Sequence, residues 1–255
     1  MTRFIRFHID RHAVNPKFGL VWNILPSTTL RAAAFRVLKR FFVTDQTLEP
    51  TQLAGFNQFF DDDDGTDSTR YGVGLDQRFS RDLFGGFELS WRDLTRVYSD
   101  RIAEDQDERL YRTYLHWAPH PSLALAAEYQ FEEFERGQVS IFGERVYRDL
   151  PELQTHYVPL NVSYYHPTGV FAKFGATYVD QEAPVDPSSS HDRFWTVDAA
   201  IGYRLPKRYG LLSLDIKNLF DEEFTYQNSF NDGAQQIPRF QPSRAVFARI
   251  NLWMF

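Results

Sequence analysis

The most chemically suggestive run in this sequence is acidic. Asp61, Asp62, Asp63 and Asp64 precede Gly65, and Asp67 follows two residues later. Clustered carboxylates before a glycine suit a hard cation such as Ca²⁺. The run departs from a calcium-binding loop, because aligning Gly65 with that loop's glycine places the first ligand position on Phe60. We therefore interpret the run as a solvated acidic loop tip.

Histidine is the next candidate for metal binding or catalysis, and its seven copies are scattered: His8, His12, His116, His120, His156, His166 and His191. Two pairs are four residues apart, but each pair straddles an expected strand end and a turn, and nothing nearby completes a metal site. A hydrolase would need a catalytic serine and histidine, for which His156 and Ser163 are the candidates. No sequence motif marks either residue as part of a nucleophile site. We expect no enzyme, and no catalytic, cofactor-binding or metal-binding residue.

Charges of both signs recur at alternate positions inside apolar runs: Asp76, Arg78, Glu88, Arg92, Arg112, Glu128, Lys173, Asp198, Asp215 and Lys217. A dry core would require every one of them to be paired, whereas a water-filled interior tolerates them. They can line a solute pathway or pair with one another across strands. Glu132, Glu133 and Glu135, near a strand end, are expected at the wet mouth of such an interior.

The elements that would position these charges are strands, because apolar residues recur with a period of two. The final run is the clearest case: Val246, Ala248, Ile250, Leu252 and Met254 alternate with Phe247, Arg249, Asn251 and Trp253. Pro159 counts against its own strand, since proline cannot donate to a ladder. The expected strands are 3–9, 18–23, 30–37, 71–79, 87–92, 111–117, 123–132, 157–164, 170–178, 195–204, 212–217 and 244–255, with 56–60 as a possible extension.

The expected connections alternate between short turns and long polar loops. The long loops are 38–70, 95–108, 135–151, 180–192 and 218–242; the short turns include Pro26-Ser27-Thr28, Ser80-Arg81-Asp82 and Pro167-Thr168-Gly169. Aromatic residues gather near strand ends: Trp22, Trp91, Trp117, Tyr129, Phe131, Tyr164, Tyr178, Trp195 and Tyr203. Long-short alternation and aromatic belts are typical of outer-membrane barrels.

The bulk composition is compatible with that architecture. The chain has 255 residues, a net charge of −6, no cysteine and 16 % aromatic residues. No basic stripe indicates nucleic acid as a partner, and no run approaches the ~20 apolar residues of a membrane helix. Charged residues occupy the place of a signal-peptide apolar region, so we expect that Met1 is not the natural start of the functional protein.

We therefore predict an all-β fold: an antiparallel, up-and-down transmembrane β-barrel of about 12 strands, either complete or part of a larger barrel. Residues 1–255 would form a single domain in the cell outer membrane of a Gram-negative bacterium. Its partners would be outer-membrane lipid and lipopolysaccharide. The terminal strand would be recognised by the barrel-assembly machinery.

Three stretches carry a family resemblance. Residues 15–22 (NPKFGLVW) with 28–32 (TTLRA) resemble a strand–turn–strand of TonB-dependent outer-membrane receptors. Residues 212–221 (LSLDIKNLFD) resemble that family's next-to-last strand, and Pro242-Ser243-Arg244 leading to Phe255 is similar to its closing strand. The resemblance implies the C-terminal part of a receptor barrel that takes up a solute such as a metal chelate, with energy delivered through TonB.

The chain also departs from that family. No plug domain and no TonB-contacting box is visible, so TonB would act only through a missing N-terminal part. Phe255 lies one position out of phase with the apolar face of the last strand. Two alternatives stay open: a plugless porin or export channel, and a soluble, aromatic-rich β module that binds carbohydrate.

Overall fold

The structure is a computed structural model, and it describes residues 13–39, 52–57, 65–99, 102–141, 144–147, 150–183, 190–224, 226 and 243–253. These residues form an all-β protein whose main sheet has eleven strands, every neighbouring pair antiparallel. No helix of the length and apolarity needed to cross a membrane occurs in these ranges. The expected antiparallel all-β architecture is confirmed.

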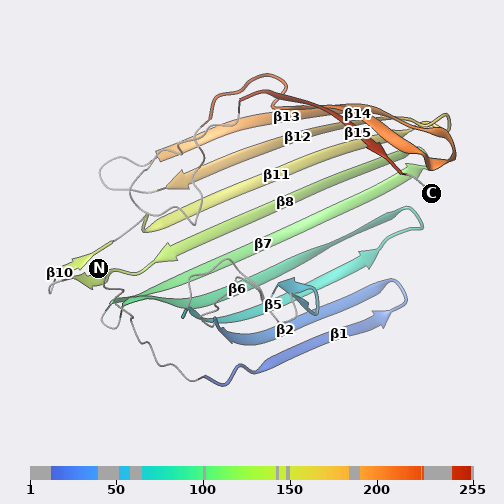
Figure 1. Ribbon diagram of the computed structural model, residues 1–255. Coiled ribbons are helices and arrows are strands. Elements are labelled where there is room, and N and C mark those ends of the chain that lie inside the picture. Colours follow the sequence, from blue (N-terminus) through green and yellow to red (C-terminus); the bar gives the residue numbers. More distant parts are fainter. Residues whose placement is uncertain are drawn as a thin grey trace.

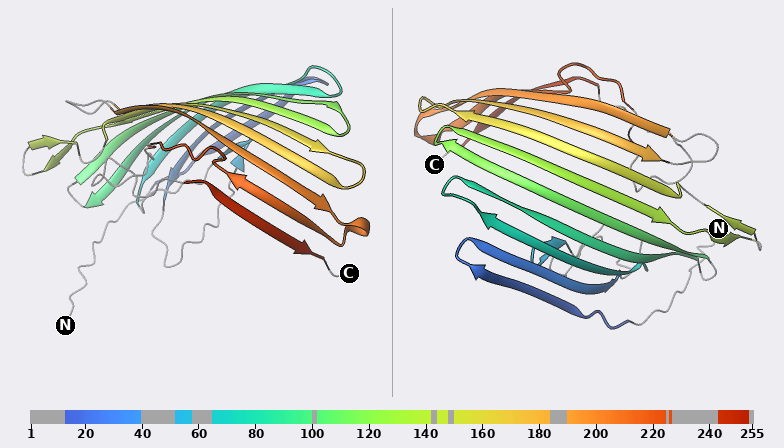
Figure 2. Two further views of the ribbon diagram at one scale, coloured as in Figure 1. Left: turned by 90° about the horizontal axis from the view of Figure 1, so that it is seen from above. Right: turned by 180° about the vertical axis from the view of Figure 1, so that it is seen from behind.

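The strands follow one another across the sheet almost in chain order (Figure 1). They are β1 (Lys17–Leu25), β2 (Thr28–Leu38), β5 (Asp67–Arg78), β6 (Leu83–Ser99), β7 (Ile102–His120), β8 (Leu123–Arg136), β11 (Glu152–Tyr165), β12 (Val170–Ala183), β13 (Ser190–Arg204), β14 (Gly210–Lys217) and β15 (Ala245–Leu252). Figure 2 shows the sheet curved into an open shell.

Two small ribbons interrupt this order. The pair β3 (Gln52–Leu53) and β4 (Phe56–Asn57) lies between β2 and β5 in the chain, and the pair β9 (Val139–Ile141) and β10 (Glu144–Val146) lies between β8 and β11. The expected strand extension at 56–60 is present at Phe56–Asn57, and residues 58–60 lie outside the described residues. Both ribbons fall within stretches that the sequence pattern assigned to irregular loops.

The β3–β4 ribbon packs on the charged side of the sheet. Phe56 is 1 % exposed and joins Ala33 and Phe35 in a small buried cluster. Its ring covers Gly72, where an added Cβ would lie 2.4 Å from Phe56 Cε1. A glycine on β5 thus makes room for an aromatic ring brought in by the preceding connection. Figure 1 shows this ribbon in front of β2 and β5.

The strands extend further than expected at the end of the long connections. Residues 95–108, predicted to be a polar loop, instead continue β6 and β7, which pair as Thr95↔Asp105, Arg96↔Glu104 and Val97↔Ala103 and leave two residues between the strands. The loops predicted at 38–70 and 180–192 are likewise shortened by β5, β12 and β13. The pattern failed there because paired strands can be polar on both faces, which resembles a loop in sequence.

Pro159 lies inside β11, although a proline at this position counted against a strand in the sequence. The ladder to β12 continues through Pro159↔Thr177, whereas no pair to β8 is recorded between Tyr157↔Gln130 and Leu160↔Ala127. The missing donor is therefore accommodated by a local gap in one ladder, with the register preserved on both sides.

The main sheet has two free edges, β1 and β15, and no pairing closes it into a barrel within the ranges given above. The count of about twelve strands differs by one from the eleven observed. The expected strand 3–9 lies outside the described residues, as do Met254 and Phe255.

Candidate functional site: the charged face of the sheet

The sheet presents two different faces, and the strand register keeps them continuous across it. One cross-strand row consists of Leu115, Ala127, Leu160, Ala176 and Val197. A row of opposite orientation consists of Arg31, Gly74, Glu88, Arg112 and Gln130. We call the first the apolar face and the second the charged face, because successive side chains of a strand point to opposite sides.

Large apolar side chains on the apolar face remain exposed, and aromatic residues border it at both ends. Leu160 is 41 % exposed and Trp195 is 50 % exposed. The border toward the long connections includes Trp91, Tyr111, Phe131, Tyr178 and Trp195, with neighbouring ring centroids 5.2–6.2 Å apart in three contacts. The border toward the short turns includes Trp22, Trp117, Tyr164 and Tyr203.

The charged face is organised around Arg31 on β2. Its Nε donates to Asp76 Oδ2 on β5 at 2.7 Å, and its Nη2 lies 3.4 Å from Glu88 Oε2 on β6. The hydroxyl of Tyr114 on β7 donates to the same Asp76. Four strands therefore contribute to one network. An arginine can satisfy it because its planar fork offers five donors.

Two glycines leave the space that the Arg31 guanidinium occupies. An added Cβ at Gly55 would lie 2.3 Å from Nη1, and one at Gly74 would lie 2.9 Å from Nη2. Gly55 also has a φ of +91°, which disfavours other residues there. The carbonyl of Ala54 accepts from Nη1 at 3.2 Å, and the Phe56 ring lies 5.4 Å from the guanidinium carbon. The β3–β4 ribbon thus helps to hold Arg31.

Further charge pairs follow across the same face. Arg112 on β7 holds Glu128 on β8 with two hydrogen bonds of 2.5 and 2.9 Å. On the later strands, Lys217 Nζ lies 2.5 Å from Asp198 Oδ2, and Arg249 Nε lies 3.5 Å from Asp215 Oδ2. Of the two alternatives for the mid-strand charges, pairing across strands is present at these positions.

A more buried polar group lies at the long-connection end of the charged face. Arg92 is 2 % exposed and donates to Glu108 at 3.1 Å, and Gln106 donates to the same carboxylate at 2.7 Å. Arg70 donates to Ser90 at 2.8 Å. Arg96, Glu104 and Arg136 are also buried there. Burying so many charges is costly unless each charge has a polar partner. These side chains therefore fix the positions of neighbouring strands relative to one another where the strands leave the apolar band.

Beyond the aromatic border, on the side of the apolar face, lies a compact group centred on Asp180. His191 Nε2 is 2.7 Å from Oδ1, and Arg193 Nε is 3.0 Å from Oδ2. Desolvation alone would raise the pKa of Asp180, but the hydrogen bonds from His191 and Arg193 outweigh it and lower that pKa. In contrast, burial and the facing carboxylate of Asp93 raise the pKa of Asp107.

The charges that the sequence pattern singled out lie on the charged face, with Arg78 at its short-turn end. Of the three expected mouth residues, Glu132 lies on the charged-face side, as expected. Glu133 and Glu135 lie on the other side, beyond the aromatic border, because they share the orientation of Phe131. There Glu133 pairs with Arg109 at 2.5 Å, and Glu135 lies 3.7 Å from the same guanidinium. Residues that were not singled out include Arg31 and Tyr114, although strand alternation places both on this face. Arg96 and Glu104 were missed because their segment was predicted to be a loop.

The histidines occupy separate structural positions. His116 stacks on Phe84 at 5.0 Å, His156 lies between Tyr129 and Phe131, and His166 accepts from Thr168 in a turn. His156 and Ser163 fall on opposite faces of β11 and cannot form a catalytic pair. In the part of the chain that the structure covers, no group of three or more acidic or histidine residues could hold a metal. His8, His12 and Asp61 to Asp64 lie outside it.

The stretch Asn218-Leu219-Phe220-Asp221, which contributed to the family resemblance, forms a tight exit from β14. Asn218 has a φ of +49° and exchanges two hydrogen bonds of 2.9 Å with the backbone of Glu222. Asparagine tolerates this left-handed conformation better than most residues. The stretch therefore has a local structural role that is independent of any family.

The arrangement places paired charges along one face, which could bind or pass a polar solute. Comparison with known proteins found no matching family model, no similar curated protein and no similar solved structure.

Proposed function

We propose that this chain forms the wall of an outer-membrane β-barrel, and that the protein takes up a solute in the manner of TonB-dependent receptors. The observation that carries the proposal is the pair of faces. An exposed apolar band with aromatic borders lies on one side of a curved antiparallel sheet, and a network of paired charges lies on the other. In water, so large an exposed apolar surface is unfavourable and indicates an apolar partner.

The dimensions of the band fit a bilayer. On β12 the apolar face runs from Val170 to Tyr178, eight residue steps or roughly 26 Å along the strand. At a tilt of about 40° this run spans an apolar height of roughly 20 Å, of the same order as the ~25 Å apolar band of outer-membrane barrels. The charged face would then line the interior, where water solvates its charged side chains.

The sequence resemblance described above supports the assignment to the receptors. The solute that the protein takes up would then be a scarce species such as a metal chelate. In this proposal the wall is a scaffold, the long connections capture the solute, and energy comes from TonB through a part of the protein outside this chain. Neither a catalytic residue nor a bound cofactor is required.

A plugless channel is the second candidate, and one observation favours it. The β3–β4 ribbon occupies the charged face over β2 and β5, with Phe56 nearly fully buried. In the proposed barrel, the β3–β4 ribbon would narrow the interior without a plug domain. It would also cover the part of the charged face that a plug domain would contact. Steady ion conductance of the reconstituted chain in a planar bilayer would support the channel; a plug-encoding reading frame upstream of Met1 would support the receptor.

The membrane proposal is tested by two adjacent substitutions on opposite faces of β11. Leu160→Arg places a charge in the apolar band, and Asn161→Arg places the same charge on the charged face. In lipid, we expect Leu160→Arg to lower the free energy of unfolding by about 2–4 kcal/mol and Asn161→Arg to change it far less. The measurement is urea unfolding of the chain folded in lipid vesicles.

A soluble carbohydrate-binding module would give another result. It would fold without detergent or lipid, and an arginine at the exposed Leu160 position would leave stability nearly unchanged. Equal tolerance of both substitutions would therefore overturn the membrane proposal.

A further inference from the structure

The short-turn end of the sheet contains a hollow of about 460 Å³ between three turns. Its walls come from the β7–β8 turn, the β11–β12 turn and the β13–β14 turn, which includes the 3-10 turn η1 (Pro206–Arg208). Backbone hydrogen bonds join the turns to their neighbours: Tyr165 donates to Ser122 at 2.8 Å, and Arg204 donates to Gly169 at 2.8 Å. The hollow is therefore held by the main chain and not by side-chain packing alone.

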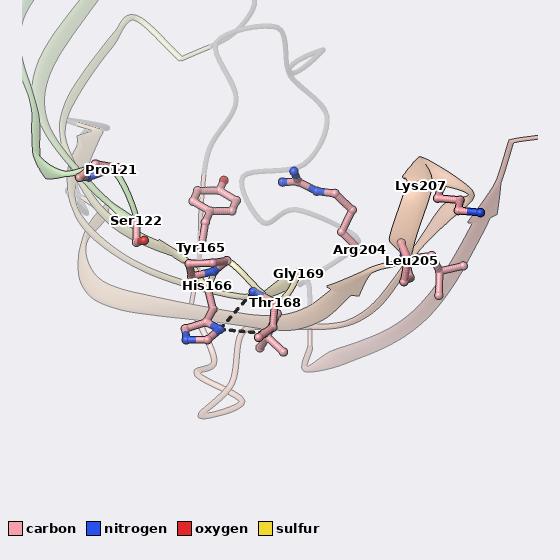
Figure 3. A pocket seen from close by; sticks show the side chains of 12 residues that line it. Pro121, Ser122, Tyr165, His166, Thr168, Gly169, Arg204, Leu205 and Lys207 are labelled. Atoms are coloured by element: carbon pink, nitrogen blue, oxygen red, sulfur yellow. Dashed lines mark hydrogen bonds between the residues drawn. The ribbon is translucent and has the colours of Figure 1, made fainter.

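Tyr165 and Arg204 face this hollow, and neither has a polar side-chain partner among the described residues. Figure 3 shows Tyr165 and Arg204 projecting to the same side of the sheet, with the guanidinium of Arg204 turned toward Tyr165. Within the placed residues, neither side chain has an ion pair or a hydrogen bond. This contrasts with Arg31, Arg112, Lys217 and Arg249 of the charged face, each of which is paired with a carboxylate.

The electrostatic surroundings favour an anion. Among the residues that the structure describes, no carboxylate lines the hollow, and the acidic residue of a neighbouring hollow, Asp82, belongs to another turn. Lys207 contributes positive charge from the β13–β14 turn, although Figure 3 shows its ammonium turned away from Arg204. A guanidinium recognises carboxylate or phosphate oxygens through two parallel hydrogen bonds, and a phenol can add a third donor.

The backbone of the hollow is constrained in a way that suits a binding site. Gly169 has a φ of +101°, and an added Cβ there would lie 2.5 Å from the carbonyl oxygen of Arg204. Lys207 adopts a φ of +53°, a conformation that costs a residue other than glycine free energy and persists only when the surroundings impose it. Such positions gather at binding sites more often than elsewhere.

We propose that this hollow is a binding site for a phosphate or carboxylate group, held by the guanidinium of Arg204 and the hydroxyl of Tyr165. The group can belong to a soluble anion or to a phospholipid headgroup, since both present the same oxygens. The site depends only on the three turns. Its failure would therefore leave the membrane proposal, which the Leu160 and Asn161 variants test, unaffected.

The soluble arm of the test uses inorganic phosphate and isothermal titration calorimetry on the chain folded in a neutral detergent. The variants are Arg204→Gln, Arg204→Lys and Tyr165→Phe, and the matched control is Arg81→Gln, an exposed arginine of another short turn. Losing the charge-assisted hydrogen bonds should weaken binding at least about tenfold in Arg204→Gln. Arg204→Lys should retain part of the affinity because its charge remains, and Arg81→Gln should match the wild type.

The lipid arm measures retention of phosphatidylglycerol by native mass spectrometry of the same variants. Dependence on Arg204 in the calorimetric arm assigns the site to a soluble anion, and dependence on Arg204 only in the lipid arm assigns it to a headgroup. Either result supports the proposal. Binding absent from both arms, or weakened equally by Arg81→Gln and Arg204→Gln, would overturn it, because the attraction would then be absent or merely diffuse. Circular dichroism of Arg204→Lys checks that the sheet is intact.

Discussion

Charged residues contribute differently to stability according to where they lie in this protein. On the charged face, most cations lie against a carboxylate of a neighbouring strand, as Arg31 does with Asp76 and Arg112 does with Glu128. Such pairs help to hold the register, and in the proposed barrel they would keep charge in a wet interior at low cost. Removing one partner from the half-buried Arg31 network should therefore cost more than removing an exposed pair such as Arg109 and Glu133.

The pH dependence of stability can be predicted for Asp180, which lies beyond the aromatic border. Its pKa is lowered in the folded protein, so its contribution is present above the unfolded pKa near ~3.9 and is lost as the pH falls through the lower folded value. Asp180→Asn should therefore reduce stability at pH 7 by less than about 1 kcal/mol, because the group is largely solvated. Unfolding of both proteins between pH 7 and pH 3 should show the difference disappearing at the acidic end. A difference that grew on acidification would contradict the assignment.

At the scale of the elements, the β3–β4 ribbon is a connection between strands that packs onto the charged face of the sheet. The ribbon has only two residues in each strand, so its own hydrogen bonds cannot hold it. It is held by Phe56 over Gly72 and by the bond from Arg31 to the carbonyl of Ala54. Small-residue positions on β5 thus decide where the connection packs.

Gly72→Val tests this dependence. A valine side chain at position 72 would overlap the Phe56 ring, since even its Cβ would lie 2.4 Å from a ring carbon. We expect a loss of about 1–3 kcal/mol in the free energy of unfolding, with faster hydrogen exchange at residues 52–57. Gly175→Val on β12 is the control, because an added Cβ there meets its nearest atom only at 3.0 Å and far from the ribbon. Unchanged exchange at 52–57 in Gly72→Val would show that the ribbon is held otherwise.

At the scale of the whole molecule, the number of strands decides how the sheet can be completed. Eleven antiparallel strands leave β1 and β15 running in the same direction. Pairing them directly would make one parallel ladder in an otherwise antiparallel wall, whereas bacterial barrels have an even number of antiparallel strands. A closed wall therefore requires an odd number of additional strands between these two edges.

The chain has no cysteine, so this expectation can be tested with engineered pairs. Leu20→Cys with Ala32→Cys joins directly opposed residues of β1 and β2 and should form an intramolecular disulfide on oxidation. Leu20→Cys with Ile250→Cys spans the two free edges and should not. Non-reducing gel mobility of the lipid-folded protein distinguishes the outcomes. An efficient β1–β15 disulfide would show that the eleven strands close on themselves.

The sequence by itself determined the central parts of the main strands, their alternation of apolar and charged sides, and the aromatic borders, because side-chain direction in a strand follows from a period of two. Only the tertiary structure decided which charges meet, since Arg31, Asp76 and Tyr114 come together through register across β2, β5, β6 and β7. It also turned residues 95–108 from an expected loop into paired strands. Pairing supplies backbone hydrogen bonds to a polar segment, and no local pattern records that a partner strand lies alongside.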